Sequence, residues 1–250
     1  MKILSWNIAC LPEKINHLKN NNNRVKAIIK FIHYKKPDII SLQEVFTTNS
    51  RKLLKTYLEK NNYYVYLSPN THFLLNGGLL LASKYEIIDM DNIIFKNTLG
   101  EDALTYKGIL YIKIKYKENY INIFNTHLNN NKPLYCINTL YINKIIRFQL
   151  NEFLEYFYSK IKNNIYNIYI LTGDFNLPFQ SKYYKCFINK LKKKINLLKN
   201  SNEIITDNIN NIQIDYIKTC FHKNINFNTN FKIYTYKQFH KLSDHNPLIK

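Results

Sequence analysis

The stretch of sequence that decides the fold is IYILTGDFN, residues 168–176. It opens with apolar residues typical of a buried β-strand and ends in a polar turn. Gly173 lies directly before Asp174, where the strand must turn, and the chain contains only five glycines. A glycine in so glycine-poor a sequence indicates a backbone requirement. We therefore expect this strand to place Asp174 and Asn176 at a sheet edge, where catalytic groups collect in layered α/β folds.

Five further short segments repeat the pattern of a polar residue at the end of an apolar run. These five segments are SWN 5–7, LQE 42–44, NTHL 125–128, IDY 214–216 and SDH 243–245, and GDFN 173–176 is the sixth of the set. One such segment would carry little weight, because polar residues commonly follow strands. Six of them, spread from residue 5 to residue 245, predict that the whole chain is built around one site.

Length and composition favour a single domain that spans residues 1–250. Hydrophobic residues make up 46% of the chain, enough for a substantial core. The formal net charge of +19 favours an anionic partner, such as nucleic acid, a membrane surface or a phosphate ester. Only three of the 36 basic residues are arginine, which binds phosphate in bidentate fashion, so compositional bias is an alternative origin of the charge.

Cysteine usage and hydropathy indicate a reducing compartment. The four cysteines are Cys10, Cys136, Cys186 and Cys220; they form no CxxC pair, and we expect free thiols. Removal of the short apolar stretch at residues 3–11 would delete Trp6 and Asn7, so we expect no signal peptide. No run of about 18 apolar residues occurs, so no transmembrane segment is expected. We expect an intracellular, cytoplasmic monomer.

Strand-like and helix-like segments alternate along the chain, which predicts an α/β protein. Strand-like runs cover residues 2–8, 38–42, 63–67, 78–83, 109–116, 120–126, 167–172, 213–217 and 232–236. Apolar stripes at helical spacing predict helices around residues 25–32, 53–58, 142–157 and 181–198. In residues 109–116 apolar residues alternate with lysines, which predicts an antiparallel strand with one exposed face.

Glu44 and Asn7 are candidate metal ligands. Glu44 ends the apolar run at residues 38–44, and a carboxylate there suits Mg²⁺, which takes one or two protein carboxylates, several waters and the substrate phosphate. Asn7 ends the first strand and can contact a metal or a phosphate oxygen without adding charge. Taken alone, Glu44 is equally a surface residue that opens a loop, and Asn7 is more often a turn residue.

Two histidines follow strand-like runs and are candidate proton carriers. Phosphodiester hydrolysis needs a base that activates water and an acid for the leaving oxygen, and His127 and His245 can share these roles near neutral pH. Each then needs a carboxylate that holds its tautomer, and Asp215 and Asp244 are available. A lone histidine is more often structural, and we expect the others to be surface or packing residues; these are His17, His33, His72, His222 and His240.

Asp174 and Asn176 offer complementary chemistry within one turn. Asp174 can orient or deprotonate the attacking water, and the Asn176 amide can donate to phosphoryl oxygens as charge builds. An isolated Asp-x-Asn turn is usually structural. The most specific segment is SDHNP, residues 243–247, because its polar residues and proline directly precede the apolar pair at residues 248–249. A solvated tail rarely has this pattern.

These segments together resemble the endonuclease/exonuclease/phosphatase superfamily, the DNase I-like fold. Their order and spacing match as well as their residue types, over essentially the whole chain. The resemblance implies a four-layer α/β sandwich, in which two mixed β-sheets pack face to face with helices outside. It also implies Mg²⁺-dependent cleavage of a phosphoester by in-line attack of water, without a covalent enzyme intermediate; Mn²⁺ is the alternative cation.

The resemblance further implies which residues hold the cation and the substrate. Glu44 would be the main Mg²⁺ ligand with Asn7 beside it, and Asp244 would complete the metal and histidine shell. Asp174 and Asn176 would position the nucleophilic water and the phosphate.

The resemblance assigns the proton transfers to the two histidines. His245 would be the general base, oriented by Asp215. His127 would stabilise the phosphate or protonate the leaving group. Substrate contacts would thus come from Asn7, Asn176 and His127.

The NTHL segment at residues 125–128 separates branches of the superfamily. Class II abasic-site endonucleases carry Tyr-x-Pro-Asn there, whereas this chain resembles the neutral sphingomyelinase, DNase I and phosphoinositide-phosphatase branches. Leu11-Pro12 and Lys107-Gly108 resemble the sphingomyelinase branch in particular. The sequence shows no exposed aromatic hairpin or long amphipathic anchor of the secreted sphingomyelinase type.

Three functional hypotheses are open at this stage. The first is a phosphodiesterase acting on a phospholipid head group, sphingomyelinase-like, with an inositol-phosphate phosphatase as a variant. The second is a DNase I-like endonuclease or exonuclease acting on nucleic acid, motivated by the net charge. The third is an inactive member used as a binding protein, which the full set of key residues disfavours. Peripheral contact with anionic surfaces is expected under the first two.

Overall fold

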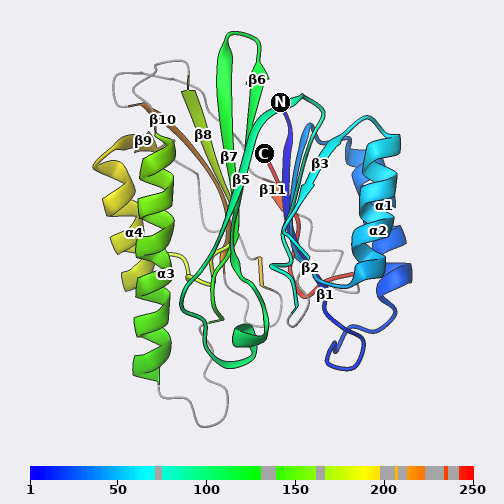
Figure 1. Ribbon diagram of the computed structural model, residues 1–250, viewed down its shortest axis with the longest axis horizontal. Helices are drawn as coiled ribbons and strands as arrows, with labels where there is room; N and C mark the ends of the chain where they lie inside the picture. The colour runs from blue at the N-terminus through cyan, green and yellow to red at the C-terminus, as the bar shows by residue number, and fades with distance from the viewer. Residues whose placement is uncertain are drawn as a thin grey trace.

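Two β-sheets face each other in the computed structural model of the chain, with helices on the outside (Figure 1). The structure describes residues 1–70, 75–130, 139–161, 167–197, 206–207, 213–222, 234–235 and 242–250. Cys136, His72 and His240 lie outside the described residues, as does part of the strand predicted at residues 232–236. The free thiols predicted at Cys10, Cys186 and Cys220 are confirmed.

The first sheet has the strand order β11-β12-β1-β2-β4-β3. Its strands are β1 Ile3–Cys10, β2 Ile39–Val45, β3 Tyr64–Leu67, β4 Leu80–Ser83, β11 Tyr234–Thr235 and β12 Leu248–Ile249. β1 pairs parallel with β2 and antiparallel with β12, so the sheet is mixed. The Ile3 N–H donates to the carbonyl of Lys250 at 2.7 Å, which joins the two ends of the described chain in one sheet.

The second sheet has the strand order β5-β6-β7-β8-β10-β9. Its strands are β5 Ile87–Ile94, β6 Gly108–Tyr116, β7 Asn119–His127, β8 Asn167–Asp174, β9 Ile195–Leu197 and β10 Asp215–His222. β8 pairs parallel with β7 and antiparallel with β10. The registers place His127 opposite Asp174, and Asp174 opposite Asp215. Three predicted site residues are therefore direct neighbours across adjacent strands.

Helices cover the outer face of each sheet (Figure 1). α1 Asn21–Lys35 and α2 Thr48–Lys60 lie on the first sheet, and α3 Thr139–Lys160 and α4 Lys182–Lys192 lie on the second. Side chains of β1 alternate accordingly: Leu4 and Trp6 pack under the helices, whereas Ile3 faces the other sheet. The predicted four-layer α/β sandwich is confirmed. No helix in the described ranges has the length and apolar composition that crossing a bilayer requires.

Polar side chains tie the two sheets together near the site. Gln43 Nε2 donates to Asn125 Oδ1 at 2.8 Å, and Asn125 Nδ2 donates to the carbonyl of Leu42 at 2.9 Å. These groups are buried, so each depends on its partner for hydrogen bonding. Because Gln43 precedes Glu44 and Asn125 lies two residues before His127, the ties fix the distance between the two halves of the site.

Gly173 meets the backbone requirement that the sequence indicates. Its φ is +136°, and a Cβ built there would lie 2.0 Å from the carbonyl oxygen of Thr126. The close approach of β7 and β8 at this point therefore excludes any side chain.

Several local predictions are wrong in extent. The helix predicted over residues 181–198 ends at Lys192, and residues 195–197 form β9. β5, β9 and β12 were not predicted; β5 alternates acidic and apolar residues at a sheet edge, which resembles a loop. The exposed face predicted for residues 109–116 is largely buried, with only Lys115 exposed, because helices and the first sheet cover both faces of β6.

Candidate active site

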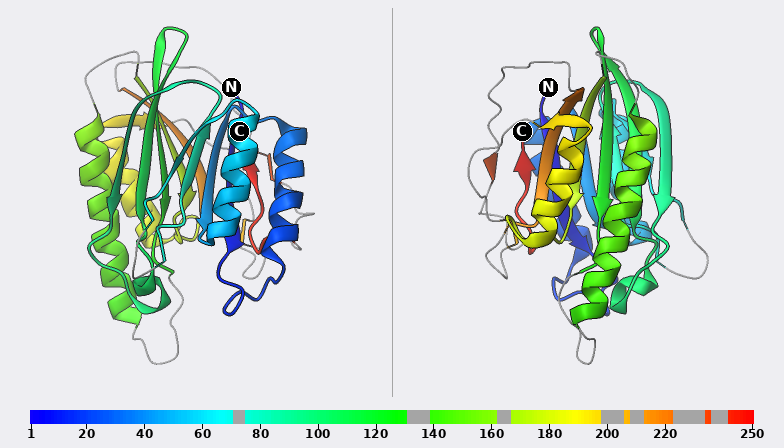
Figure 2. Two further views of the ribbon diagram at one scale, coloured as in Figure 1. Left: turned by 45° about the vertical axis from the view of Figure 1, so that its right-hand side comes forward. Right: turned by 90° about the vertical axis from the view of Figure 1, so that its left-hand side faces the viewer.

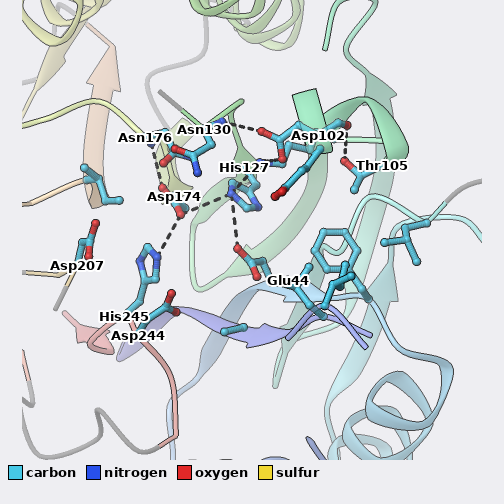
Figure 3. A pocket seen from close by; sticks show the side chains of 18 of the residues that line it. Glu44, Asp102, Thr105, His127, Asn130, Asp174, Asn176, Asp207, Asp244 and His245 are labelled. Carbon is cyan, nitrogen blue, oxygen red and sulfur yellow. Dashed lines mark hydrogen bonds and ion pairs between the residues drawn. The ribbon is translucent and has the colours of Figure 1, made fainter. Parts of the chain in front are cut away.

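A cavity of about 680 Å³ opens at one end of the sandwich, where strands of both sheets end (Figure 3). Its polar lining includes Glu44, Asp102, Lys107, His127, Asp174, Asn176, Asp207, Asp244 and His245. Two other predicted residues, Asn7 and Asp215, lie behind this lining and hydrogen-bond to it. The structure thus brings all eight predicted site residues together at one place, whereas their chemical roles stay predictions.

Asn7 connects two carboxylates of the cavity wall. Its Nδ2 donates to Glu44 Oε1 at 2.9 Å and to Asp174 Oδ2 at 3.1 Å. Its Oδ1 accepts the N–H of Ala9 at 3.1 Å, which orients the amide with its donor toward the carboxylates. In this orientation Asn7 positions Glu44, and the contact predicted between its oxygen and a cation stays a prediction.

Glu44 reaches the cavity from the end of β2 in an unusual backbone conformation. Its φ is +56°, in the left-handed region that costs a non-glycine residue about 1 kcal/mol or more. Strain of this kind is retained where it aims a side chain at a functional site. Burial raises the pKa of Glu44, and the nearby charge of Asp244 raises it further.

His245 is held by the carboxylate that the sequence predicted. Its Nδ1 lies 2.8 Å from Asp215 Oδ2, and its Nε2 lies 3.7 Å from Asp174 Oδ2. Burial lowers the pKa of His245, but Asp215 and then Asp174 favour the imidazolium and raise that pKa well above its ordinary value. The bond to Asp215 holds the ring in one orientation, with Nε2 directed toward Asp174 in the cavity wall (Figure 3).

His127 lies nearer to a cation than to the carboxylates around it. Its Nε2 lies 3.0 Å from Lys107 Nζ, 3.5 Å from Asp174 Oδ2 and 4.0 Å from Glu44 Oε1. Burial lowers the pKa of His127 well below its ordinary value, and the Lys107 charge adds to this effect. His127 is therefore neutral near pH 7. No described residue bonds its Nδ1.

Asp174 lies at the centre of the site. Its Oδ1 accepts the N–H of Asn176 at 2.9 Å, while Oδ2 faces Asn7 and both histidines. Burial and the charge of Asp215 together raise the pKa of Asp174 to about 7. Asn176 has a φ of +48°, and its Nδ2 donates to the carbonyl of Leu128 at 2.9 Å. This turn closes the cavity wall against the end of β7.

The SDH segment is anchored to β1. Ser243 Oγ donates to the carbonyl of Asn7 at 2.6 Å and accepts the N–H of His245 at 3.1 Å. Trp6 Nε1 donates to the carbonyl of His245 at 2.8 Å. These bonds carry His245 into the cavity from the far end of the sequence.

The sequence leaves Asp244 available as a partner for His127, but the structure does not pair these two residues. Its Oδ2 instead lies 3.8 Å from His17 Nε2, and both residues line the cavity. His17, expected to be a surface or packing residue, therefore belongs to the mouth of the site. The turn that directs His245 inward directs the preceding side chain, that of Asp244, toward the loop between β1 and α1.

Lys107 is the principal residue that the site prediction missed. Its side chain is 2% exposed, and Nζ contacts Asp102 Oδ1 at 2.7 Å, His127 Nε2 at 3.0 Å and the Leu128 carbonyl at 2.9 Å. In the sequence, the Lys107-Gly108 pair carries a family resemblance and no other sign of a site residue. Lysine is nearly always a surface residue, so its burial is evident only in the folded chain.

The carboxylates of the cavity fit a divalent cation. Besides burial, the charge of Asp244 raises the pKa of Glu44, and the charge of Asp215 raises the pKa of Asp174. A bound cation would offset this unfavourable concentration of negative charge. Asp174, Asp215 and His245 also bring ligand atoms within 4.8 Å of one another. Glu44 and Asp244 are the more accessible carboxylates, whereas Asp215 is engaged with His245, so we favour the former pair as ligands of a hydrated cation.

Comparison with known proteins identifies relatives of this chain. Sphingomyelinase C 2 from Leptospira interrogans is 27% identical over 208 residues, which cover 76% of this chain and 33% of the relative. Sphingomyelinase DDB_G0288017 from Dictyostelium discoideum is 32% identical over 170 residues, which cover 56% of this chain and 37% of the relative. The matched region therefore spans about a third of the length of these curated relatives.

Solved structures share the fold. A beta toxin from Staphylococcus aureus with bound magnesium ions superposes with a TM-score of 0.80 at 19% identity, covering 99% of this chain and 98% of that one. D. rerio TDP2 complexed with single-strand DNA product superposes with a TM-score of 0.73 at 15% identity, covering 100% of this chain and 97% of that one. The predicted resemblance to the DNase I-like superfamily and its sphingomyelinase branch is confirmed. The prediction of a phosphoric ester hydrolase is confirmed at the level of the family. A model of the Endonuclease/Exonuclease/phosphatase family matches residues 4–245, and the chain belongs to that family.

Proposed function

We propose that this chain is a Mg²⁺-dependent phosphodiesterase that releases the head group of a phospholipid of the sphingomyelin type. The observation that carries the proposal is the pairing of His245 with Asp215, 2.8 Å apart, on the wall of a cavity that also holds Glu44. A base and a cation ligand that face one space can activate water against a phosphoester. The sphingomyelinases among its relatives favour the lipid substrate.

His245 and its partners handle the proton of the attacking water. His245 Nε2 takes that proton, and the carboxylate of Asp215 stabilises the resulting imidazolium through Nδ1. Asp174, whose Oδ2 lies 3.7 Å from Nε2, holds the water in line with the phosphorus. The raised pKa of His245 makes it a strong base once it is deprotonated.

Lys107 supplies positive charge for the phosphoryl oxygens. Because burial keeps His127 neutral, its ring can offer hydrogen bonding but no charge. The Lys107 ammonium lies 3.0 Å from that ring and is held by Asp102 Oδ1 at 2.7 Å and the Leu128 carbonyl at 2.9 Å, so its position is fixed before a phosphate binds. We assign the charge-stabilising role to Lys107 and a positioning role to His127.

Glu44 and Asp244 would hold the cation, oriented by Asn7 and the Ser243 turn. When bound, the cation supplies Lewis-acid polarisation of the phosphoryl oxygens. Mg²⁺ is proposed because the available ligands are oxygen atoms and the site leaves room for water and phosphate. Mn²⁺ is the alternative that the same ligands accept.

A nuclease is the second candidate. The net charge of +19 favours a polyanionic substrate, and the cavity chemistry is equally suited to a DNA phosphodiester. The fold is shared with a protein whose structure contains single-strand DNA product, although so low an identity speaks for the fold alone.

A paired assay tests both candidates. Purified protein with Mg²⁺ is given sphingomyelin vesicles and, separately, plasmid DNA at low salt. We expect head-group release without nicking, abolished in Glu44→Ala and retained in the matched control Glu59→Ala, whose carboxylate is exposed on α2 and pairs with Lys55. Nicking without head-group release would favour the nuclease, and activity that persists in Glu44→Ala would remove the proposed metal role.

A further inference from the structure

Large apolar side chains are exposed around the mouth of the cavity. Ile15 is 65% exposed in the loop between β1 and α1, and Leu104 is 58% exposed at the end of η1 Gly100–Leu104; both line the cavity. Leu140 and Tyr141, in the first turn of α3, are 71% and 64% exposed. We call these four residues the apolar rim.

The three elements that carry the apolar rim reach the same end of the molecule. Figures 1 and 2 show the loop after β1, η1 and the first turn of α3 at the lower end in every view, and the strand ends that form the cavity lie between them. The three elements therefore surround the opening, and the four residues that they carry do not form one contiguous patch. Single exposed apolar residues are ordinary, and what distinguishes these four is their shared position at the mouth of one cavity, which two of them line.

The exposed face of α3 near the apolar rim combines apolar and basic residues. Phe148 follows Leu140 and Tyr141 by two helical turns, with exposed Lys144 and Arg147 between them. Lys144 Nζ lies 5.8 Å from the centre of the Phe148 ring. Residues 139–151 contain no acidic side chain. Aromatic and aliphatic groups interleaved with cations are typical of helices that lie on anionic lipid surfaces.

Basic residues also flank Ile15 on the opposite side of the mouth. Lys14 and Lys19 are exposed there. Glu13 is the acidic residue of this loop, and its Oε1 accepts the N–H of Asn21 at 2.7 Å at the start of α1. η1 carries Glu101 and Asp102, of which Asp102 pairs with Lys107 at 2.7 Å. Beside the apolar rim, on α3 and on the loop after β1, exposed basic residues outnumber acidic ones, which favours an anionic surface.

We propose that the apolar rim is a docking surface for a phospholipid bilayer that contains anionic lipid. A partner that binds to all three elements also covers the cavity. Binding of such a partner is compatible with catalysis only if the partner carries the substrate. A bilayer satisfies this condition because its head groups then face the cavity. This inference rests on the proposed phospholipid substrate.

A vesicle-binding experiment without turnover tests the docking surface. Flotation is carried out in EDTA with vesicles of phosphatidylcholine and sphingomyelin, with and without phosphatidylserine. We expect binding to the phosphatidylserine vesicles that is at least about tenfold weaker in the combined variant Ile15→Ser, Leu104→Ser, Leu140→Ser, Tyr141→Ser, and weaker in Lys144→Glu with Arg147→Glu. All these side chains are exposed, so the melting temperature should not change.

Tyr34→Ser is the matched control. Tyr34 is 77% exposed with Lys35 Nζ 4.9 Å from its ring centre, which reproduces the aromatic and cationic pairing of α3 near the other end of α1. It should bind vesicles as the parent chain does. Wild-type protein that fails to float, or combined variants that float equally well, would overturn the inference.

Two further readouts separate this inference from the proposed function. Hydrolysis of the soluble diester bis(p-nitrophenyl) phosphate should be equal in the parent chain and in the double variant Leu140→Ser, Tyr141→Ser, because neither of these two residues lines the cavity. Rim-dependent vesicle binding without head-group release would support the docking surface and contradict the lipid substrate. A parent chain that sediments as a dimer, dissociated by the rim substitutions, would show that a second copy covers the rim and would overturn the bilayer as its occupant.

Discussion

Nδ1 of His245 lies 2.8 Å from Oδ2 of Asp215, although 30 residues separate them in the sequence. Because this bond occupies Nδ1, the other ring nitrogen alone is available to a reacting water. The remaining oxygen of Asp215, Oδ1, has no partner among the described residues. The carboxylate thus serves the histidine and is not part of a wider structural network.

We predict that Asp215→Asn lowers kcat at least about a hundredfold, the scale usual for acid–base groups. An amide can present its N–H to Nδ1 and select the wrong tautomer, so Nε2 would lose its free lone pair. Steady-state kinetics measure the effect, and His245→Gln should produce a loss of similar size. Because Glu44 is untouched, both variants should still bind Mg²⁺; loss of metal binding as well would show that Asp215 is a ligand.

Lys107→Met should lower kcat/KM at least about tenfold, since a buried cation that faces a phosphoryl group is lost. Lys107→Arg should restore little, because the larger guanidinium cannot occupy the space between Asp102, His127 and the Leu128 carbonyl. Lys84→Met is the control, as Lys84 is partly exposed and pairs with Asp38. Equal rates in the Lys107 and Lys84 variants would contradict the role assigned to Lys107.

Mg²⁺ should raise the melting temperature of the parent chain but not of Glu44→Gln, because a ligand that binds the folded state alone stabilises it. The effect should weaken with acidity. Burial raises the pKa of the ligand Glu44 in the folded state, so protons compete with the cation at a higher pH than they would for an ordinary carboxylate. Calorimetric titrations between about pH 8 and about pH 5.5 should show that the affinity for Mg²⁺ decreases as the pH decreases. The decrease should begin at a higher pH than carboxylates with ordinary pKa values would give. A pH-independent affinity would contradict these ligands.

Gly173→Ala should destabilise the fold by about 3 kcal/mol or more, the sum expected for backbone strain and overpacking. A Cβ would approach the Thr126 carbonyl to 2.0 Å, and β7 and β8 would have to separate at the point where they place His127 and Asp174. Urea unfolding measures the loss. A variant as stable as the parent chain would show that the strands can yield there.

The strand ends could be predicted because polar residues after apolar runs have a local cause, the turn that must follow a buried strand. Asp174, His127 and Glu44 were found in this way. Their mutual arrangement could not be, because it depends on which strands pair; the alignment of His127, Asp174 and Asp215 across three strands is a property of the assembled sheet.

Lys107 and Asp244 show where local patterns lose their meaning. Lysine is nearly always a surface residue, so a burial of 98% could arise only from a tertiary neighbourhood of Asp102, His127 and a carbonyl. For Asp244, residue type indicated a partner for histidine, but the turn at Ser243 decided which histidine it meets. The direction of a side chain in a turn is not encoded by periodicity.

The attachment of the SDH segment to β1 has a consequence for protein synthesis. β12 and His245 reach the first strand only after more than two hundred residues have been made, and Ser243 and Trp6 then fasten them in place. A nascent chain that still lacks these residues holds Glu44 but neither the proposed base His245 nor the proposed second cation ligand Asp244. The proposed activity would therefore appear only after residue 245 has left the ribosome, which would spare nearby lipids from a partly folded enzyme.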